Sequence, residues 1–215
     1  MKIMVIAAHP DDEVLGCGGT IARHAAEGDE VHIVFLADGE TSRTMAAKRN
    51  RNMAALAASK ILGAQPPVFF DWNDQMLDTV PLLRITQGIE EQIAKIKPDV
   101  AYIHHAGDLN LDHRIAHQAA VTALRPLPGA SCRAIYAFEV LSSTEWGAGF
   151  APTHFVDIAD APMRRKIKAL ECYAEEMRDS PHPRSFGVVN SLAHYRGATV
   201  GVPAAEAFMT IRTIR

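Results

Sequence analysis

Residues 2–28, KIMVIAAHPDDEVLGCGGTIARHAAEG, give the clearest indication of the fold in this chain. Residues 2–8 form an unbroken apolar run of strand length, and residues 14–27 have the composition of a helix. A second apolar run, residues 31–37, follows after a short polar interval. Unbroken apolar strands joined by helices are typical of a parallel sheet that is covered on both faces. The stretch therefore predicts a β–α–β unit.

The same alternation continues to about residue 140. It predicts a helix over 45–62 ending at Gly63, a strand over 68–70, a helix over 82–96 before Pro98, a strand over 100–103 and a helix over 112–124. This order predicts an α/β fold, with a Rossmann-like, doubly wound, mostly parallel sheet and helices on both faces.

The pattern is weaker after Pro126. We expect strands over 134–140 and 154–158, a helix over 161–177, a loop over 179–187, a short helical stretch over 191–195 and a tail ending in 211–214. With 215 residues, the chain is expected to form one domain, 1–215, with a Rossmann-like core in 1–140 and a small C-terminal elaboration in 141–215.

Composition excludes several classes of protein. The 22 basic and 25 acidic residues give 22 − 25 = −3, which does not favour a nucleic-acid binder. Hydrophobic residues at 48% exclude a disordered chain, and three widely spaced cysteines argue against disulfides or a thiolate metal cluster. The first apolar run is too short for a signal peptide, and no run has the roughly eighteen apolar residues of a membrane span, so a cytoplasmic protein is expected.

Histidines and carboxylates follow two of the predicted strands. His9-Pro10-Asp11-Asp12-Glu13 comes directly after the first strand, and His104-His105 and then 108–113 (DLNLDH) come after the fourth. Ligands of open α/β sheets bind beyond the carboxyl ends of the strands, so both groups are expected at one edge of the sheet.

These residues suit a catalytic zinc ion. Such an ion takes three protein ligands and leaves one position open, and His9, Asp12 and His113 satisfy that number. Asp11, which precedes one of these ligands, would then act as general base. A simpler interpretation is that Asp11, Asp12, Asn110 and Asp112 only cap the helices that follow them.

Dinucleotide binding is a competing interpretation. Gly16, Gly18 and Gly19 lie in the first strand-to-helix unit, and Asp38 follows the second strand. The glycines begin too far after the strand, and acidic residues occupy the helix N-terminus where a pyrophosphate would bind. We therefore expect the glycines to allow close packing of helix and sheet.

The motif Ala8-His9-Pro10-Asp11-Asp12-Glu13, with 16–20 (GCGGT) after it and Asp112-His113-Arg114 about a hundred residues later, resembles the PIG-L (LmbE-like) family of zinc-dependent N-deacetylases. The resemblance extends to 41–42 (TS), Arg51, 71–74 (DWND) and the segment from 195 to 208. It implies one zinc ion per chain on His9, Asp12 and His113, with Asp11 as general base and later proton donor.

The resemblance also implies further site residues. Arg51 matches a substrate-binding arginine, and Asp74 matches an acid near the sugar hydroxyls. Several family members have an oxyanion-stabilising histidine where this chain has Asn110, which can donate a hydrogen bond but carries no charge. That role could pass to His105 or Tyr195, while Asp112 would orient a ligand or the helix.

Other candidates come from the loops. His182 and Arg184 lie between prolines in 180–185 (SPHPRS) and are candidate substrate contacts, and specificity is expected in the loops 41–50, 142–152 and 179–187.

We expect a hydrolase that removes an acetyl group from an N-acetylated amino sugar of N-acetylglucosamine type, releasing acetate and an amine. The expected partner is a small-molecule substrate, without nucleic acid or a membrane span, and self-association is possible. Two alternatives stay open: a metal-dependent hydrolase of a non-sugar amide or a phosphoester, and a non-catalytic nucleotide- or metal-binding module.

Overall fold

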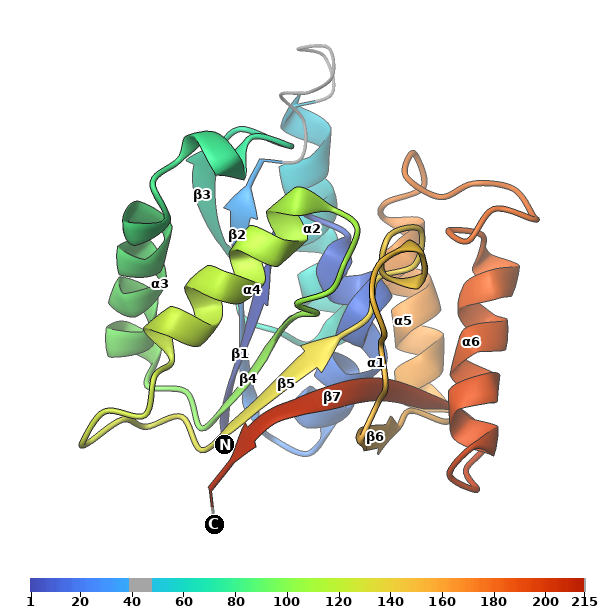
Figure 1. Cartoon of the computed structure of the whole chain (residues 1–215). Coiled ribbons are helices and arrows are strands. Elements are labelled where there is room, and N and C mark those ends of the chain that lie inside the picture. The colour runs from blue at the N-terminus through green and yellow to red at the C-terminus, as the bar shows by residue number, and fades with distance from the viewer. Residues whose placement is uncertain (39–47, 215) are drawn as a thin grey trace.

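The computed structural model describes residues 1–38 and 48–214, and its centre is a seven-stranded sheet in the order β3-β2-β1-β4-β5-β7-β6 (Figure 1). The strands are β1 (Lys2–Ala7), β2 (Glu30–Ala37), β3 (Val68–Trp72), β4 (Val100–His104), β5 (Ala134–Phe138), β6 (His154–Asp157) and β7 (Ala205–Thr213). Strands β1 to β5 are parallel, and β7 runs antiparallel to both β5 and β6. This topology confirms the predicted Rossmann-like, mostly parallel sheet.

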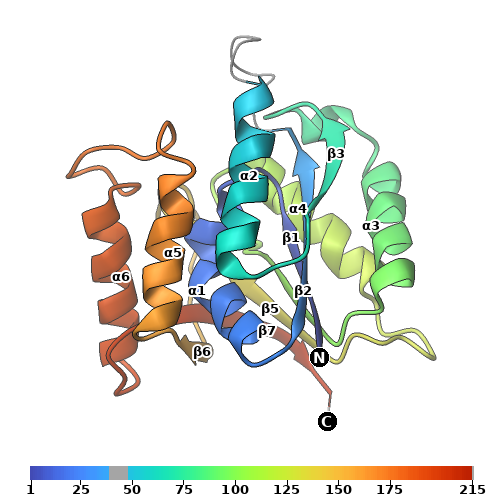
Figure 2. The ribbon, with the colours of Figure 1, turned by 180° about the vertical axis from the view of Figure 1, so that it is seen from behind.

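Helices cover both faces of the sheet (Figures 1 and 2). They are α1 (Asp12–Ala26), α2 (Lys48–Leu62), α3 (Leu82–Ile96), α4 (Leu111–Ala123), α5 (Ala161–Glu171) and α6 (Phe186–Ala198), with short 3-10 turns η1 (Leu77–Thr79) and η2 (Thr144–Trp146). Side chains alternate along β1, so Ile3 and Val5 pack with α1, α2 and α5, while Met4 and Ile6 pack with α3 and α4. Each face of the central strands thus has its own core.

The C-terminal part differs from the sequence-based expectation. Helix α5 ends at Glu171 rather than at 177, because Cys172 and Tyr173 donate backbone hydrogen bonds to residues three positions earlier, as in a tight turn. Tyr173 and Met177 still pack in the core, which is why the apolar spacing continued past the helix end. The short stretch at 191–195 is part of the longer α6, and the expected tail is part of β7. The expected start of α2 at residue 45 lies outside the described residues.

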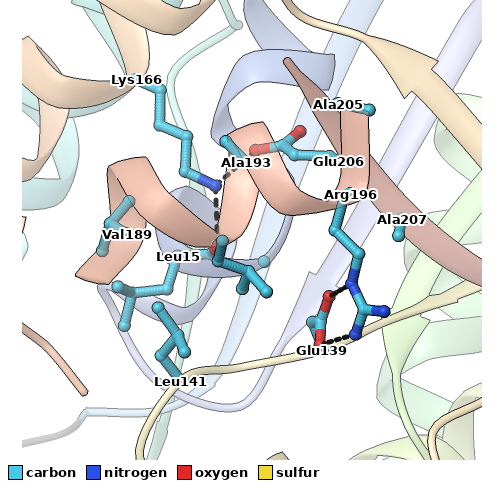
Figure 3. A pocket seen from close by; sticks show the side chains of 12 residues that line it. Leu15, Glu139, Leu141, Lys166, Val189, Ala193, Arg196, Ala205, Glu206 and Ala207 are labelled. Carbon is cyan, nitrogen blue, oxygen red and sulfur yellow. Dashed lines mark hydrogen bonds and ion pairs between the residues drawn. The ribbon is translucent and has the colours of Figure 1, made fainter. Parts of the chain in front are cut away.

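Helix α1 is broken at Cys17, whose φ of −146° and ψ of 24° are not helical. A buried ion pair between Lys166 and Glu206 lies beside the break and binds the backbone groups there (Figure 3). Glu206 of β7 accepts hydrogen bonds from the amides of Gly19 (2.9 Å) and Thr20 (2.7 Å). Lys166 of α5 donates to the carbonyl of Leu15 (2.9 Å) and to Glu206 (2.6 Å). The groups freed by the break are therefore paired from two other elements.

Glycines let the front of α1 approach the sheet closely. A β-carbon at Gly16 would overlap the ring of Phe138, and one at Gly19 would lie 2.8 Å from Ile158. The close packing expected from the sequence is present. Within the described ranges, no helix combines the length and apolar character needed to cross a membrane.

Candidate functional site

The two predicted groups of polar residues meet at one edge of the sheet. Strands β1 and β4 are neighbours, and the chain leaves β1 toward β2 on one side and returns to β4 on the other. This is the topological switch point, where open α/β sheets bind their ligands. The segment after β1 carries His9, α4 carries His113, and the two rings lie 5.5 Å apart.

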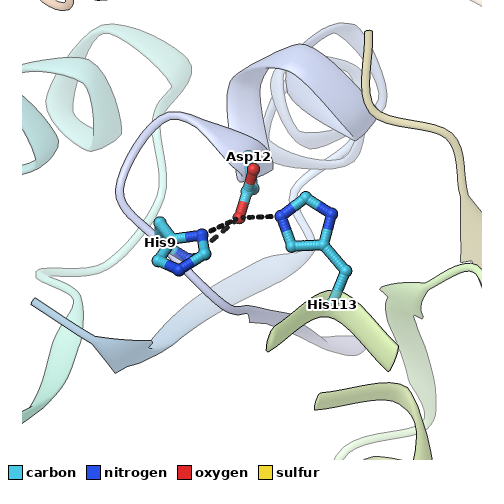
Figure 4. A group of neighbouring side chains, drawn as sticks. All are labelled: His9, Asp12 and His113. Atoms are coloured by element: carbon cyan, nitrogen blue, oxygen red, sulfur yellow. Dashed lines mark hydrogen bonds and ion pairs between the residues drawn. The ribbon is translucent and has the colours of Figure 1, made fainter. Parts of the chain in front are cut away.

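His9, Asp12 and His113 converge on a common point (Figure 4). Asp12 Oδ2 lies 3.3 Å from His9 Nδ1 and 3.3 Å from His113 Nε2. One ligand atom from each residue lies within 4.8 Å of the other two, and all three side chains are buried. Asp12 Oδ1 is buried and has no hydrogen-bond partner among residues 1–38 and 48–214. Two imidazoles, a carboxylate and an unpaired oxygen fit a divalent cation such as zinc.

The second nitrogen of each histidine is held by a carboxylate. His9 Nε2 lies 2.9 Å from Asp112 Oδ2 and 3.1 Å from Asp74 Oδ1. His113 Nδ1 lies 3.2 Å from Asp108 Oδ1 and 3.3 Å from Ser143 Oγ. Metal-binding histidines in proteins almost always have such a partner, which fixes the ring orientation and the tautomer. The surroundings of the group therefore also fit a metal site.

Asp112 is itself fixed by the backbone. Its two carboxylate oxygens accept hydrogen bonds from the amides of Gln75 (2.9 Å) and Leu77 (3.0 Å). The loop after β3 thus locks the carboxylate that faces His9. The contact with His9 is the one through which Asp112 would orient a metal ligand, the role expected of it from the sequence.

The charges of the group are strongly coupled. Burial alone would raise the pKa of Asp12, but His113 and hydrogen bonds from the neighbouring histidines hold that pKa well below its usual value. Burial lowers the pKa of His113, yet the charge of Asp12 and the hydrogen bonds that His113 donates to Asp108 and Asp12 outweigh it and raise the pKa to about 9. Burial also lowers the pKa of His9, but its hydrogen bonds to Asp112, Asp12 and Asp74 outweigh burial and keep this pKa well above 6.5. The carboxylates thus make a strongly cation-attracting group.

His104 forms one wall of the group. Its ring stacks on His113 with centroids 4.0 Å apart, and its Nε2 accepts a hydrogen bond from the amide of Ala8 (2.8 Å). Burial and the charge of His113 lower the pKa of His104 to about 4. His104 is therefore a neutral residue inside the site.

Asp11 lies next to the group formed by His9, Asp12 and His113, and its backbone is in a strained conformation. Its φ of 118° and ψ of −30° are rarely adopted by residues other than glycine, and such strain concentrates at functional sites. The carboxylate is buried, and its Oδ2 lies 2.9 Å from Arg184 Nη1 and 3.2 Å from Arg51 Nη2. Burial raises the pKa of Asp11, while Arg184 and Arg51 act in the opposite direction.

The remaining predicted residues have different positions. Asn110 caps α4, accepting a hydrogen bond from the amide of Asp112 (2.9 Å), so the capping interpretation holds for this residue. His105 Nε2 lies 2.8 Å from the carbonyl of Ala148 and anchors the loop before β6. His182 accepts a hydrogen bond from the amide of Arg184 (3.0 Å). Tyr195 is 62% exposed on α6, and the guanidinium group of Arg196 lies over its ring, 5.7 Å from the ring centroid.

Several residues of the site were not predicted. Asp108 and Ser143 hold His113, and Glu176 lies 2.9 Å from Arg51. Asp108 belongs to the polar cluster before α4, so its position in that cluster could have pointed to it. Ser143 lies in the loop 142–152, where specificity was expected, and Glu176 lies in the segment predicted as the end of a helix over 161–177; neither stands in a motif that singles it out.

Fold and site together are those of a Rossmann-like protein with a buried His–Asp–His group at the switch point of its sheet. The family model described as PIG-L: GlcNAc-PI de-N-acetylase matches residues 4–124, and the chain belongs to this family. The family expected from the motif is thereby confirmed.

Deacetylases are found among the relatives, in agreement with the predicted reaction. An uncharacterized deacetylase of Escherichia coli, YaiS, is 29% identical, over 79% of this chain and 88% of the relative. A 4-oxalmesaconate hydratase of Pseudomonas putida is 30% identical, over 80% of this chain and 72% of the relative. The solved structure of the N,N'-diacetylchitobiose deacetylase of Pyrococcus horikoshii has a TM-score of 0.81 at 22% identity, covering 98% of this chain and 84% of that one.

Proposed function

We propose that this protein is a zinc-dependent N-deacetylase that hydrolyses the acetamide of an N-acetylated amino sugar or its conjugate. The observation that carries the proposal is the buried group of His9, Asp12 and His113, with the buried carboxylate of Asp11 beside it. Membership of a family described by de-N-acetylation of an N-acetylglucosamine lipid supports the same reaction.

His9, Asp12 and His113 would hold one zinc ion. A bound zinc ion polarises a carbonyl oxygen and lowers the pKa of water at its open position. Asp112, Asp74 and Asp108 keep the two histidine rings in place for this task. Asp74 would therefore help to orient the ring of His9, in addition to making the sugar contact that the resemblance implies.

Asp11 would transfer the proton. It accepts a proton from the water that attacks the amide carbonyl, and it returns that proton to the nitrogen as the carbon–nitrogen bond breaks. The products are acetate and a free amine. Asn110 remains the candidate donor to the oxyanion, because its side-chain oxygen caps α4 while its amide nitrogen is chemically able to donate.

The substrate would lie against the loops at this edge. A cavity of about 200 Å³ is lined by Ser142, Glu176, Arg178, His182 and Arg184. His182, Arg184 and Arg51 would contact polar or anionic groups of the substrate. His105 and Tyr195 stay candidates for the outer part of the site, and residues 41–47 of the expected specificity loop lie outside the described residues.

Acetate release tests the proposal. Zinc-loaded protein is incubated with N-acetylglucosamine, N,N'-diacetylchitobiose and a panel of other N-acetylated amino sugars, and acetate is measured. We expect turnover of at least one of them, which chelation abolishes and zinc restores. Absence of acetate from the whole panel would contradict the proposal.

Addition of water to an unsaturated carboxylate is a second candidate function. The 30% identity to a hydratase and the two arginines beside Asp11 favour it, because paired guanidinium groups suit a carboxylate substrate. Incubation of the same zinc-loaded protein with 4-oxalmesaconate separates the two functions: consumption of this compound without acetate release from any sugar supports the hydratase.

A further inference from the structure

The backbone of Asp11 needs support to stay in its strained conformation. The Asp11 amide donates a hydrogen bond of 2.9 Å to Glu13 Oε2. Glu13 is fully buried, and its other oxygen accepts a hydrogen bond of 2.7 Å from the hydroxyl of Tyr173. Tyr173 therefore fixes Glu13, which in turn holds the backbone of Asp11.

The side chain of Asp11 has a separate support. Arg51 and Arg184 both contact Asp11 Oδ2, and both also approach Glu176 Oε2, at 2.9 Å and 3.9 Å. Arg184 Nε donates in addition to Ser142 Oγ (2.7 Å). Glu176 thus contacts the same two guanidinium groups as Asp11 and can hold them beside the Asp11 carboxylate.

Both supports come from the short segment between α5 and α6. Tyr173 and Glu176 are three residues apart, and the amide of Glu176 donates to the carbonyl of Tyr173 (2.9 Å). Both side chains are buried, with 2% and 6% exposure. The early end of α5 at Glu171 produces this turn, which lies beside the front of α1.

We propose that Tyr173 and Glu176 are positioning residues for Asp11, acting on its backbone through Glu13 and on its carboxylate through Arg51 and Arg184. The inference rests on the proposed function, in which Asp11 moves the proton. It makes the segment after α5 a part of the catalytic apparatus, although neither residue contacts the metal-binding group in the described structure.

A purely structural role makes different predictions. If the turn only completed the core, loss of the Tyr173 hydroxyl or of the Glu176 charge would lower the melting temperature without changing the turnover of the folded protein. A positioning role acts on the step in which Asp11 moves a proton, so kcat falls while the zinc content stays close to wild type. KM also stays close to wild type in Tyr173→Phe, which acts through Glu13 and leaves the contacts of Arg51 and Arg184 in place. Misplacement of a reacting group by about 1 Å can cost on the order of 10²-fold in rate.

The test uses zinc-loaded, full-length Tyr173→Phe and Glu176→Gln. Tyr136→Phe and Glu175→Gln are matched controls, since Tyr136 packs in the sheet away from Asp11 and Glu175 is an exposed neighbour. Each variant is measured for zinc content, melting temperature, kcat and KM on the N-acetylated sugar that wild type hydrolyses best. Each change is also combined with Asp11→Asn, and crystal structures of the two test variants are determined.

We expect a fall in kcat of about 10- to 100-fold for the test variants, with little change in the controls. In the Asp11→Asn background, the same changes have no further effect on the residual rate. The crystal structures are expected to show Asp11 with a changed φ in Tyr173→Phe, and with a carboxylate moved away from at least one arginine in Glu176→Gln.

An unchanged Asp11 in both crystal structures, or losses of rate that persist in full in the Asp11→Asn background, would overturn the inference. The crystallographic result does not depend on turnover. If wild type releases no acetate from any sugar, the proposed function fails, and the geometry of Asp11 still decides whether Tyr173 and Glu176 position it.

Discussion

Helix α1 passes through two buried polar clusters that differ in how fully their groups are paired. At the break near Cys17, Lys166 and Glu206 neutralise each other and satisfy the amides and the carbonyl that the break exposes. At the N-terminal end of the helix, which we call its front, Asp12 Oδ1 has no hydrogen-bond partner within the described ranges. Nδ1 of the neighbouring His104 also has none there.

The backbone differs in the same way. Asp11, at the front of α1, has a φ of 118°, whereas the non-helical Cys17 at the break has a φ of −146°. The first value lies in the left-handed range that residues with a side chain rarely adopt, whereas the second has the negative sign that is usual for such residues. At the break, an ion pair and paired backbone groups without a positive φ indicate a structural role, although Thr20 Oγ1 has no partner among the described residues. At the front, unpaired atoms beside His9 and His113 and a positive φ are typical of a functional site.

Removal of the metal is expected to have the largest effect on activity. Chelation of zinc should abolish acetate release, because the carbonyl then lacks its polarising ion, and added zinc should restore it. Acetate release and zinc content are measured in parallel on the same samples. A full rate in zinc-free protein would show that the front cluster is not a catalytic metal site.

Asp11→Asn should have the next largest effect. Loss of positioned proton transfer typically costs about 10²–10⁴-fold in rate, and zinc should remain bound because its three proposed ligands are unchanged. The steady-state kcat and the zinc content check this expectation. Asp160→Asn, at an exposed position, is the control, and a kcat of Asp11→Asn equal to that of the control would remove Asp11 from the mechanism.

Asp112→Asn should act through His9. Loss of a carboxylate behind a metal-binding histidine typically weakens metal affinity by about 10–100-fold. Activity should therefore recover when zinc is added in excess. Calorimetric zinc titration and rates at several zinc concentrations test this; a low rate that zinc does not restore would instead give Asp112 a direct role in the reaction.

Lys166→Met should have the smallest effect on activity and a large one on stability. It leaves Glu206 buried without its cation, and breaking a buried ion pair in this way typically costs about 3–5 kcal/mol. The free energy of unfolding in urea should fall accordingly, while the rate per folded molecule and the zinc affinity stay unchanged. A loss of zinc affinity would show that the two clusters are coupled.

Much of the parallel core could be predicted because its signals are local. The apolar runs at 2–8 and 31–37 are buried strands, and the helix expected over 82–96 has these bounds in the structure. The motif at His9–Glu13 and His113 in the helix after β4 predicted three side chains that the structure brings within 4.8 Å of one another.

The rest depends on contacts between distant segments. Strand β7 pairs with β5 about seventy residues earlier, and its sequence alone does not give this register. Glu176 lies in a turn where the apolar spacing predicted a helix, and its contacts with Arg51 and Arg184 come from distant segments of the chain. For Asn110 the sequence could not decide between two roles, because the same side chain suits both a helix cap and a catalytic hydrogen-bond donor.

Calorimetric zinc titration of wild type, His113→Ala and Lys166→Met tests whether His9, Asp12 and His113 form the metal site. We expect one tightly bound zinc ion per chain in wild type and in Lys166→Met, and loss of tight binding in His113→Ala. Equal stoichiometry and affinity in wild type and His113→Ala would contradict this site, because zinc would then bind somewhere other than the N-terminal end of α1.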